Sequence, residues 1–167
     1  MKTENSKLKI FFASDHAGFE MKKALIEYVK ELGYETEDCG AYELNPEDDY
    51  PEFIKRAAQA VSNDPENSKA IILGGSGQGE AMAANRFPNV RAVVFYGPYY
   101  NTNQIFPVFF RAFDVLKLSR EHNDANVLSI GARFVPLKFA KKVVKIWLET
   151  PFSNEERHIH RISQIEN

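Results

Sequence analysis

Short apolar segments alternate along this chain with longer amphipathic ones, and the alternation constrains the fold more than any other feature of the sequence. Most of the short segments are apolar at consecutive positions, which is typical of strands in a parallel sheet that is covered by helices on both faces. We therefore expect an α/β fold, in which five parallel strands form the middle layer of a three-layer αβα sandwich. The predicted strands span residues 9–13, 35–38, 70–73, 91–95 and 126–130.

Amphipathic spacing predicts the helices between the strands. Met21, Leu25, Tyr28 and Leu32 recur at intervals of four, three and four residues, which places them on one helical face. Such a doubly wound, Rossmann-like sheet binds its ligands beyond the carboxyl ends of its strands. The 167 residues suit a single domain, with a C-terminal arm over residues 151–167.

Composition excludes several classes of function. The formal net charge is -2, from 21 basic and 23 acidic side chains, so the basic surface of a nucleic-acid-binding protein is not expected. No apolar run reaches the ~18 residues of a membrane span, and the first residues lack the apolar centre of a signal peptide. We expect a cytoplasmic protein with no nucleic-acid or membrane partner.

Residues 74–80 are the most informative segment, because four of the first six are glycines. Glycines let backbone N–H groups come close to a ligand. The dinucleotide spacing G-x-G-x-x-G and the Lys-Ser/Thr pair of a P-loop are both absent, so we predict a different kind of ligand loop. Glu80 follows at the start of a helix. It is either a favourable first-turn acid or a general base held beside the ligand.

Charged residues gather at several predicted element ends. Asp15 and His16 follow the first strand, where Asp15 could cap a helix or both could face a ligand. Arg133 follows the fifth strand. Arg157 and Arg161 are four residues apart and would share a helical face. Arginines suit a phosphate dianion, although a solvated charged tail would contain the same residues.

No metal site is expected. The histidines are His16, His122, His158 and His160, and no ligand spacing joins them to acidic residues or to Cys39. His122 lies in a polar segment before the fifth strand, where a surface position and a functional one are equally compatible with the sequence. Cys39 is the only cysteine and reads as a small buried residue.

Six segments occur along the chain in this order: residues 14–18, 49–51, 75–80, 83–86, 120–126 and 131–133. Together they resemble the family of type B ribose-5-phosphate isomerases and galactose-6-phosphate isomerase subunits. The resemblance extends from residue 9 to about residue 162. Many members of that family have a cysteine base at the position of Gly74. This sequence is more similar to the subgroup that uses a glutamate at the end of the loop, which Glu80 matches.

The resemblance implies an aldose–ketose isomerase that interconverts ribose 5-phosphate and ribulose 5-phosphate without metal or cofactor. Glu80 would move a proton between C1 and C2, and His122 would open the furanose ring. The resemblance also implies a homodimer or dimer of dimers with shared active sites. The sugar would be held by Asp15, His16, Gly75, Ser76, Gly77, Gln78, Gly79 and Asn123, and its phosphate by Arg133, Arg157 and Arg161.

Two alternatives remain beside this function. The substrate could be another aldose phosphate, such as a hexose 6-phosphate or a tetrose 4-phosphate, because only the width of the pocket would differ. The protein could also be a non-catalytic sugar-phosphate sensor on the same fold. The presence of both Glu80 and His122 argues against a sensor, which needs neither residue.

An aromatic insertion near residues 97–115 departs from the family pattern. It is too apolar for a free loop, so we predict that it packs against a partner subunit and borders the active-site entrance. The alternative is that it thickens the core of its own subunit. The segment and its border contain seven aromatic residues, Tyr96, Tyr99, Tyr100, Phe106, Phe109, Phe110 and Phe113.

Overall fold

The computed structural model describes residues 8–97 and 108–166, without the side chains of residues 108–112. Within these residues, five parallel strands form one sheet in the order β2-β1-β3-β5-β4, which confirms the predicted α/β architecture. The strands are β1 (Lys9–Ser14), β2 (Glu35–Asp38), β3 (Ser68–Gly74), β4 (Ala92–Phe95) and β5 (Val127–Gly131). The helices are α1 (Phe19–Glu31), α2 (Tyr50–Asn63), α3 (Gln78–Ala84), α4 (Val108–Glu121), α5 (Leu137–Glu149) and α6 (Glu156–Glu166).

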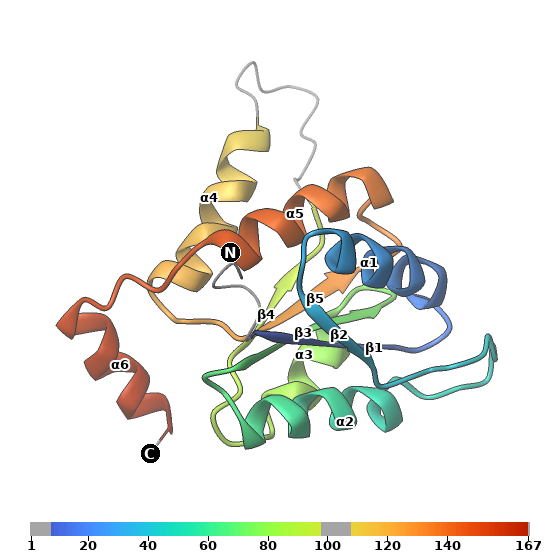
Figure 1. Cartoon of the computed structure of the whole chain (residues 1–167), viewed down its shortest axis with the longest axis horizontal. Helices are drawn as coiled ribbons and strands as arrows, with labels where there is room; N and C mark the ends of the chain where they lie inside the picture. The colour runs from blue at the N-terminus through green and yellow to red at the C-terminus, as the bar shows by residue number, and fades with distance from the viewer. Residues whose placement is uncertain (1–7, 98–107, 167) are drawn as a thin grey trace.

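The sheet is the middle layer of the sandwich. Helices α1, α4 and α5 cover one face, and α2 and α3 cover the other (Figure 1). Alternate side chains of β3 enter opposite cores: Ile71 and Leu73 pack with the first layer, whereas Ala70 and Ile72 pack with the second. Both faces of β3 are therefore buried, which explains why its sequence is continuously apolar.

Of the four residues predicted for the apolar face of α1, Leu25 is buried and Met21, Tyr28 and Leu32 are partly buried; the buried face also includes Phe19, Ile26 and Val29. The predicted spacing leaves Lys22 outside the apolar face, but its side chain is fully buried. Its ammonium group donates hydrogen bonds to Asp38 Oδ1 at 2.5 Å and to the carbonyl oxygen of Ala41 at 2.6 Å. Lys22 therefore joins α1 to the end of β2 and to the start of the loop that precedes α2.

The aromatic insertion can be followed only in part. Tyr99, Tyr100 and Phe106 lie outside the described residues, as do the side chains of Phe109 and Phe110. Tyr96 is exposed. Phe113 packs on Phe139 of α5 in the same chain, with 5.3 Å between ring centroids, as the alternative interpretation expects for this one ring. The prediction of an interface role for the remaining rings is untested.

Helix α6 stands apart from the two helical layers, at the left of Figure 1. Its far end is tied to the segment before β4, because Glu166 Oε1 pairs with Arg91 Nη1 at 2.6 Å and Glu166 Oε2 accepts the Asn89 N–H at 2.9 Å. Among the helices described, none combines the length and the apolar character that crossing a membrane requires.

Candidate active site

The carboxyl ends of the three central strands meet at one edge of the sheet. Ser14 of β1 pairs with Leu73 of β3, and Gly74 of β3 pairs with Gly131 of β5. The segments that follow these strands carry many of the predicted site residues. We call this set the carboxyl-edge group: Asp15, His16, residues 75–79, Glu80 and Arg133.

The glycine loop packs closely on β5 before α3 begins. Gly77 has a φ of 80°, which favours glycine. A Cβ atom there would lie 3.0 Å from Ser129 Oγ and 3.2 Å from the β5 backbone. Ser129 Oγ also donates a hydrogen bond to the Gly77 carbonyl oxygen at 2.7 Å. The loop is thus held against the sheet, which fixes the first turn of α3 and with it Glu80.

The Glu80 carboxyl group occupies the space next to Gly74. A Cβ atom built on Gly74 would overlap the carboxyl group of Glu80, which supplies its three nearest atoms. Gly74 is the position at which the resemblance described above would place a cysteine base in many proteins. A side chain at position 74 and the observed Glu80 conformer therefore exclude each other.

The Glu80 carboxyl group is buried, and its pKa lies above the ordinary value of a glutamate. Only 4% of the residue is exposed. Burial raises the pKa of its carboxyl group, the negative charge of Asp15 raises it further, and a bond to its own backbone N–H opposes both. A raised pKa brings a carboxylate closer to the operating pH, where general bases work best.

Asp15 does not cap α1. The helix begins after Gly18, without a side-chain cap, whereas Asp15 Oδ1 accepts the Ala17 N–H at 2.9 Å in the turn before it. His16 is anchored instead by Asp48, a residue of the loop before α2. Asp48 Oδ1 lies 2.7 Å from His16 Nδ1 and accepts the His16 N–H at 3.0 Å. The sequence analysis did not single out Asp48.

Arg133 completes this group. Its guanidinium lies 3.4 Å from the place where a Cβ atom on Gly75 would be. Its positive charge also acts on His16, where it lowers the pKa and so opposes Asp48. A cationic side chain therefore lies beside the glycine loop and His16.

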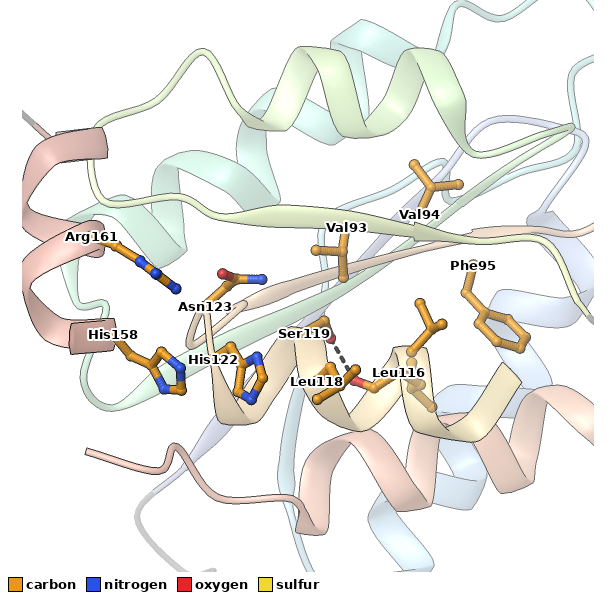
Figure 2. A pocket seen from close by; sticks show the side chains of 11 residues that line it. Val93, Val94, Phe95, Leu116, Leu118, Ser119, His122, Asn123, His158 and Arg161 are labelled. Atoms are coloured by element: carbon orange, nitrogen blue, oxygen red, sulfur yellow. Dashed lines mark hydrogen bonds between the residues drawn. The ribbon is translucent and has the colours of Figure 1, made fainter. Parts of the chain in front are cut away.

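His122 and Asn123 lie away from the carboxyl-edge group. They come after α4 and before β5, so they belong to the amino edge of the sheet. With His158 and Arg161 of α6, they line a cavity of about 350 Å³ (Figure 2). Its apolar wall comes from α4 and the edge strand β4, including Val93 and Leu118. We call His122, Asn123, His158 and Arg161 the amino-edge group.

His158 is the second functional candidate that the sequence analysis did not single out. The residue is 1% exposed, and its ring lies 4.2 Å from the His122 ring between centroids. Its Nδ1 atom is 2.8 Å from Ser153 Oγ. Burial lowers the pKa of His158, as does the neighbouring His122. The His158 ring thus packs against the histidine that was predicted to be the acid.

Arginine side chains hold the loop that carries Asn123. Arg91 Nε donates to the carbonyl oxygens of Asn123 and Asp124 at 3.0 and 3.1 Å. Arg120 Nη1 donates to Asp124 Oδ1 and to the Ala125 carbonyl oxygen, both at 2.7 Å. Because Arg91 also pairs with Glu166, the same network fixes α6 relative to this loop.

The two groups cannot meet within one chain. β5 separates His122 from Arg133, and its five residues span roughly 15 Å at ~3.3 Å per residue. Arg157 and Arg161 lie on α6, beyond the amino edge, so a single chain does not bring them to Arg133. Arg157 is 63% exposed and pairs with Glu155 at 2.8 Å.

One set of potential metal ligands occurs in the described part of the chain. Ligand atoms of Asp15, His16 and Asp48 all lie within 4.8 Å of one another. However, Asp48 Oδ1 and His16 Nδ1 already form a hydrogen bond with each other, at 2.7 Å. This contact occupies two of the atoms that a metal ion would need.

Comparison with known proteins points to one family. Residues 10–165 match the family model described as Ribose/Galactose Isomerase. Ribose-5-phosphate isomerase B of Mycobacterium tuberculosis H37Rv is 36% identical over 157 residues, which cover 94% of this chain and 87% of that protein. The Escherichia coli K12 enzyme of the same name is also 36% identical over 157 residues, with 94% and 93% covered. A crystal structure of ribose-5-phosphate isomerase B from Mycoplasma genitalium with bound ribulose-5-phosphate has a TM-score of 0.84 and 30% identity, and covers 96% of this chain and 95% of that one.

Proposed function

This chain belongs to the ribose/galactose isomerase family, and we propose that it interconverts ribose 5-phosphate and ribulose 5-phosphate. The observation that carries the proposal is the buried Glu80 carboxyl group, which has a raised pKa and lies beside the glycine loop. The relatives named ribose-5-phosphate isomerase B support the choice of substrate, and one of them was solved with bound ribulose-5-phosphate.

The reaction needs an acid and a base. Ribose 5-phosphate is mainly a furanose, and its C2 proton becomes acidic only after the ring opens to an aldehyde. His122 would donate a proton to the ring oxygen as the bond between C1 and that oxygen breaks, and the anomeric hydroxyl group would release its own proton to water, which leaves a neutral aldehyde at C1. Glu80 would then take the C2 proton, leaving an enediolate between C1 and C2 that backbone N–H groups of residues 76–79 could stabilise. Return of that proton to C1, with transfer of the O2 hydroxyl proton to O1, gives the ketose.

A shared active site accounts for the separation of the acid from the base. We propose a homodimer in which the amino-edge group of one chain faces the carboxyl-edge group of its partner. Arg133 would then meet Arg157 and Arg161 of the other chain around one phosphate. The apolar surface beside the amino-edge group supports this arrangement, because Val115 and Leu118 of α4 are 67% and 41% exposed in the isolated chain.

Subunit complementation tests the shared site. The variants Glu80→Gln and His122→Asn should each be inactive alone. Heterodimers refolded from a mixture would contain one site with both wild-type residues, so about a quarter of wild-type activity should return if chains pair at random. A mixture that stays inactive, although mass spectrometry detects the heterodimer, would show that acid and base act within one chain.

An activity panel tests the substrate. Purified protein should be assayed with ribose 5-phosphate, two hexose 6-phosphates and erythrose 4-phosphate, each over a range of concentrations. We expect the largest kcat/KM with ribose 5-phosphate. A larger value with a hexose or tetrose phosphate would reassign the substrate, and binding without turnover of any sugar would favour the non-catalytic sensor.

A further inference from the structure

Asp48 holds His16 at two points. One carboxylate oxygen, Oδ1, accepts the His16 backbone N–H at 3.0 Å and lies 2.7 Å from ring atom Nδ1. The two residues are 32 positions apart in sequence, and only 6% of the Asp48 side chain is exposed. The contact therefore fixes both the backbone and the ring of His16 relative to the loop before α2.

The chemistry of the pair determines which ring nitrogen of His16 carries the hydrogen. An ionised carboxylate only accepts hydrogen bonds, so His16 Nδ1 must carry a hydrogen when it bonds to Asp48. The other ring nitrogen, Nε2, is then left for the substrate, on a side chain that is 31% exposed. Asp48 Oδ2 is buried and has no hydrogen-bond partner among the described residues, so His16 is the main compensation for the charge of this carboxylate.

We propose that Asp48 is a positioning residue for His16, which sets its tautomer and holds its ring so that Nε2 faces the bound sugar phosphate. The role of His16 as a substrate ligand rests on the proposed function. The contact between Asp48 and His16 does not. Oriented histidines in other sites owe their tautomer to a carboxylate in the same way.

Charged groups around His16 support a cationic ring. The hydrogen bond to Asp48 raises the pKa of His16, and the charges of Asp15 and Asp48 add to this effect. Burial and the Arg133 guanidinium lower the pKa, but the net direction is upward. Loss of the Asp48 charge should therefore lower the pKa of His16 and weaken its attraction for an anionic ligand.

The loop around Asp48 has supports that do not involve the Asp48 side chain. Lys22 fixes the loop start through the Ala41 carbonyl oxygen. The Asp48 backbone N–H donates to the Asn45 carbonyl oxygen at 3.1 Å. Because these bonds remain in Asp48→Asn, that variant should keep the loop. The new amide has the same size but lacks the charge.

The experiment compares Asp48→Asn with Glu47→Gln, a matched loss of one negative charge at an exposed neighbour. Asp48→Asn should raise KM for ribose 5-phosphate roughly tenfold or more, as expected for a weakened charge-assisted contact, while Glu47→Gln leaves it unchanged. In a His16→Asn background, Asp48→Asn should have no further effect on KM, because the residue through which it acts is gone. Full additivity of the two substitutions would overturn the proposal.

An NMR titration of His16 gives a readout that needs no turnover. In the wild-type protein the pKa of His16 should lie above the ordinary value of about 6.5, and it should fall in Asp48→Asn but not in Glu47→Gln. A wild-type pKa at or below the ordinary value would overturn the proposal, even if Asp48→Asn did not fold. Because this test requires no substrate, its failure is distinct from failure of the isomerase assignment.

Discussion

Replacing Gly74 with alanine should displace the proposed base, Glu80, without changing that residue itself. The added Cβ atom would overlap the Glu80 carboxyl group, and the three atoms nearest to it all belong to that group. Gly74 is not among the glycines with positive φ in the described chain, so alanine meets no backbone strain there. The main response open to the protein is to move the Glu80 side chain away from its buried position.

The magnitudes of the two effects differ. Displacing a group that transfers a proton typically costs ~10²–10⁴ in rate, or about 2.7–5.5 kcal/mol of activation free energy. Stability should change little, because the overlapping atoms are at the end of a flexible side chain. A Gly→Ala change at a compatible position also stabilises by about 0.4–1 kcal/mol through the unfolded state. We therefore expect a large fall in kcat and a change of about 1 kcal/mol or less in the free energy of unfolding.

The assay is a double-mutant cycle. kcat and KM are measured for Gly74→Ala, Glu80→Gln and the double variant, and urea denaturation gives the stability of each. If Gly74→Ala acts by displacing Glu80, the double variant should be no slower than Glu80→Gln alone. A Gly74→Ala variant with kcat within a few-fold of wild type would refute the reasoning. So would multiplicative losses of rate in the double variant.

Three other outcomes follow from the structure. Arg157→Ala should weaken the binding of ribose 5-phosphate by about 1.5–3 kcal/mol, which would appear as a higher KM with little change in kcat. An unchanged KM in steady-state assays would remove Arg157 from the phosphate site. The lowered pKa of His158 means that the unfolded chain binds its proton more readily, so the free energy of unfolding should fall as pH drops below about 6.5. Urea denaturation at several pH values should show that the free energy of unfolding falls less steeply with decreasing pH in His158→Asn than in the wild type. The same dependence on pH in both proteins would contradict this. Burial raises the pKa of Cys39 to about 11, so the native protein should resist iodoacetamide at pH 8 while the unfolded chain reacts; fast labelling of native protein by mass spectrometry would be the contrary result.

The sheet and its carboxyl edge could be predicted because their signals are local. A strand such as β3 is buried on both faces and must be apolar throughout, and the residues after it necessarily lie at the ligand-binding edge. The order of the elements also places Glu80, which follows a strand, at the carboxyl edge of the sheet and His122, which precedes a strand, at the amino edge. The resemblance supplied their roles, whereas the sheet order decides that they lie at opposite edges.

Asp48, His158 and Lys22 were missed for one physical reason. Each is a polar residue whose environment depends on contacts with residues distant in sequence. Asp48 lies among acidic neighbours in a polar loop, and only its contact with His16, 32 residues away, distinguishes it. Lys22 has the sequence context of a solvated helix position, but the end of β2 covers it. The spacing of apolar residues predicts which apolar side chains are buried, but it does not predict that a charged side chain is buried with a partner.

The most direct test of the account is to incubate ribose 5-phosphate in D₂O with the wild-type protein and with Glu80→Gln, and to follow the sugars by NMR. The wild type should form ribulose 5-phosphate with deuterium incorporated at C1, because the base that removes the C2 proton can exchange it with solvent before returning it. Glu80→Gln should bind the sugar and form no detectable ketose. Absence of turnover by the wild type, or turnover by Glu80→Gln at close to the wild-type rate, would contradict the account.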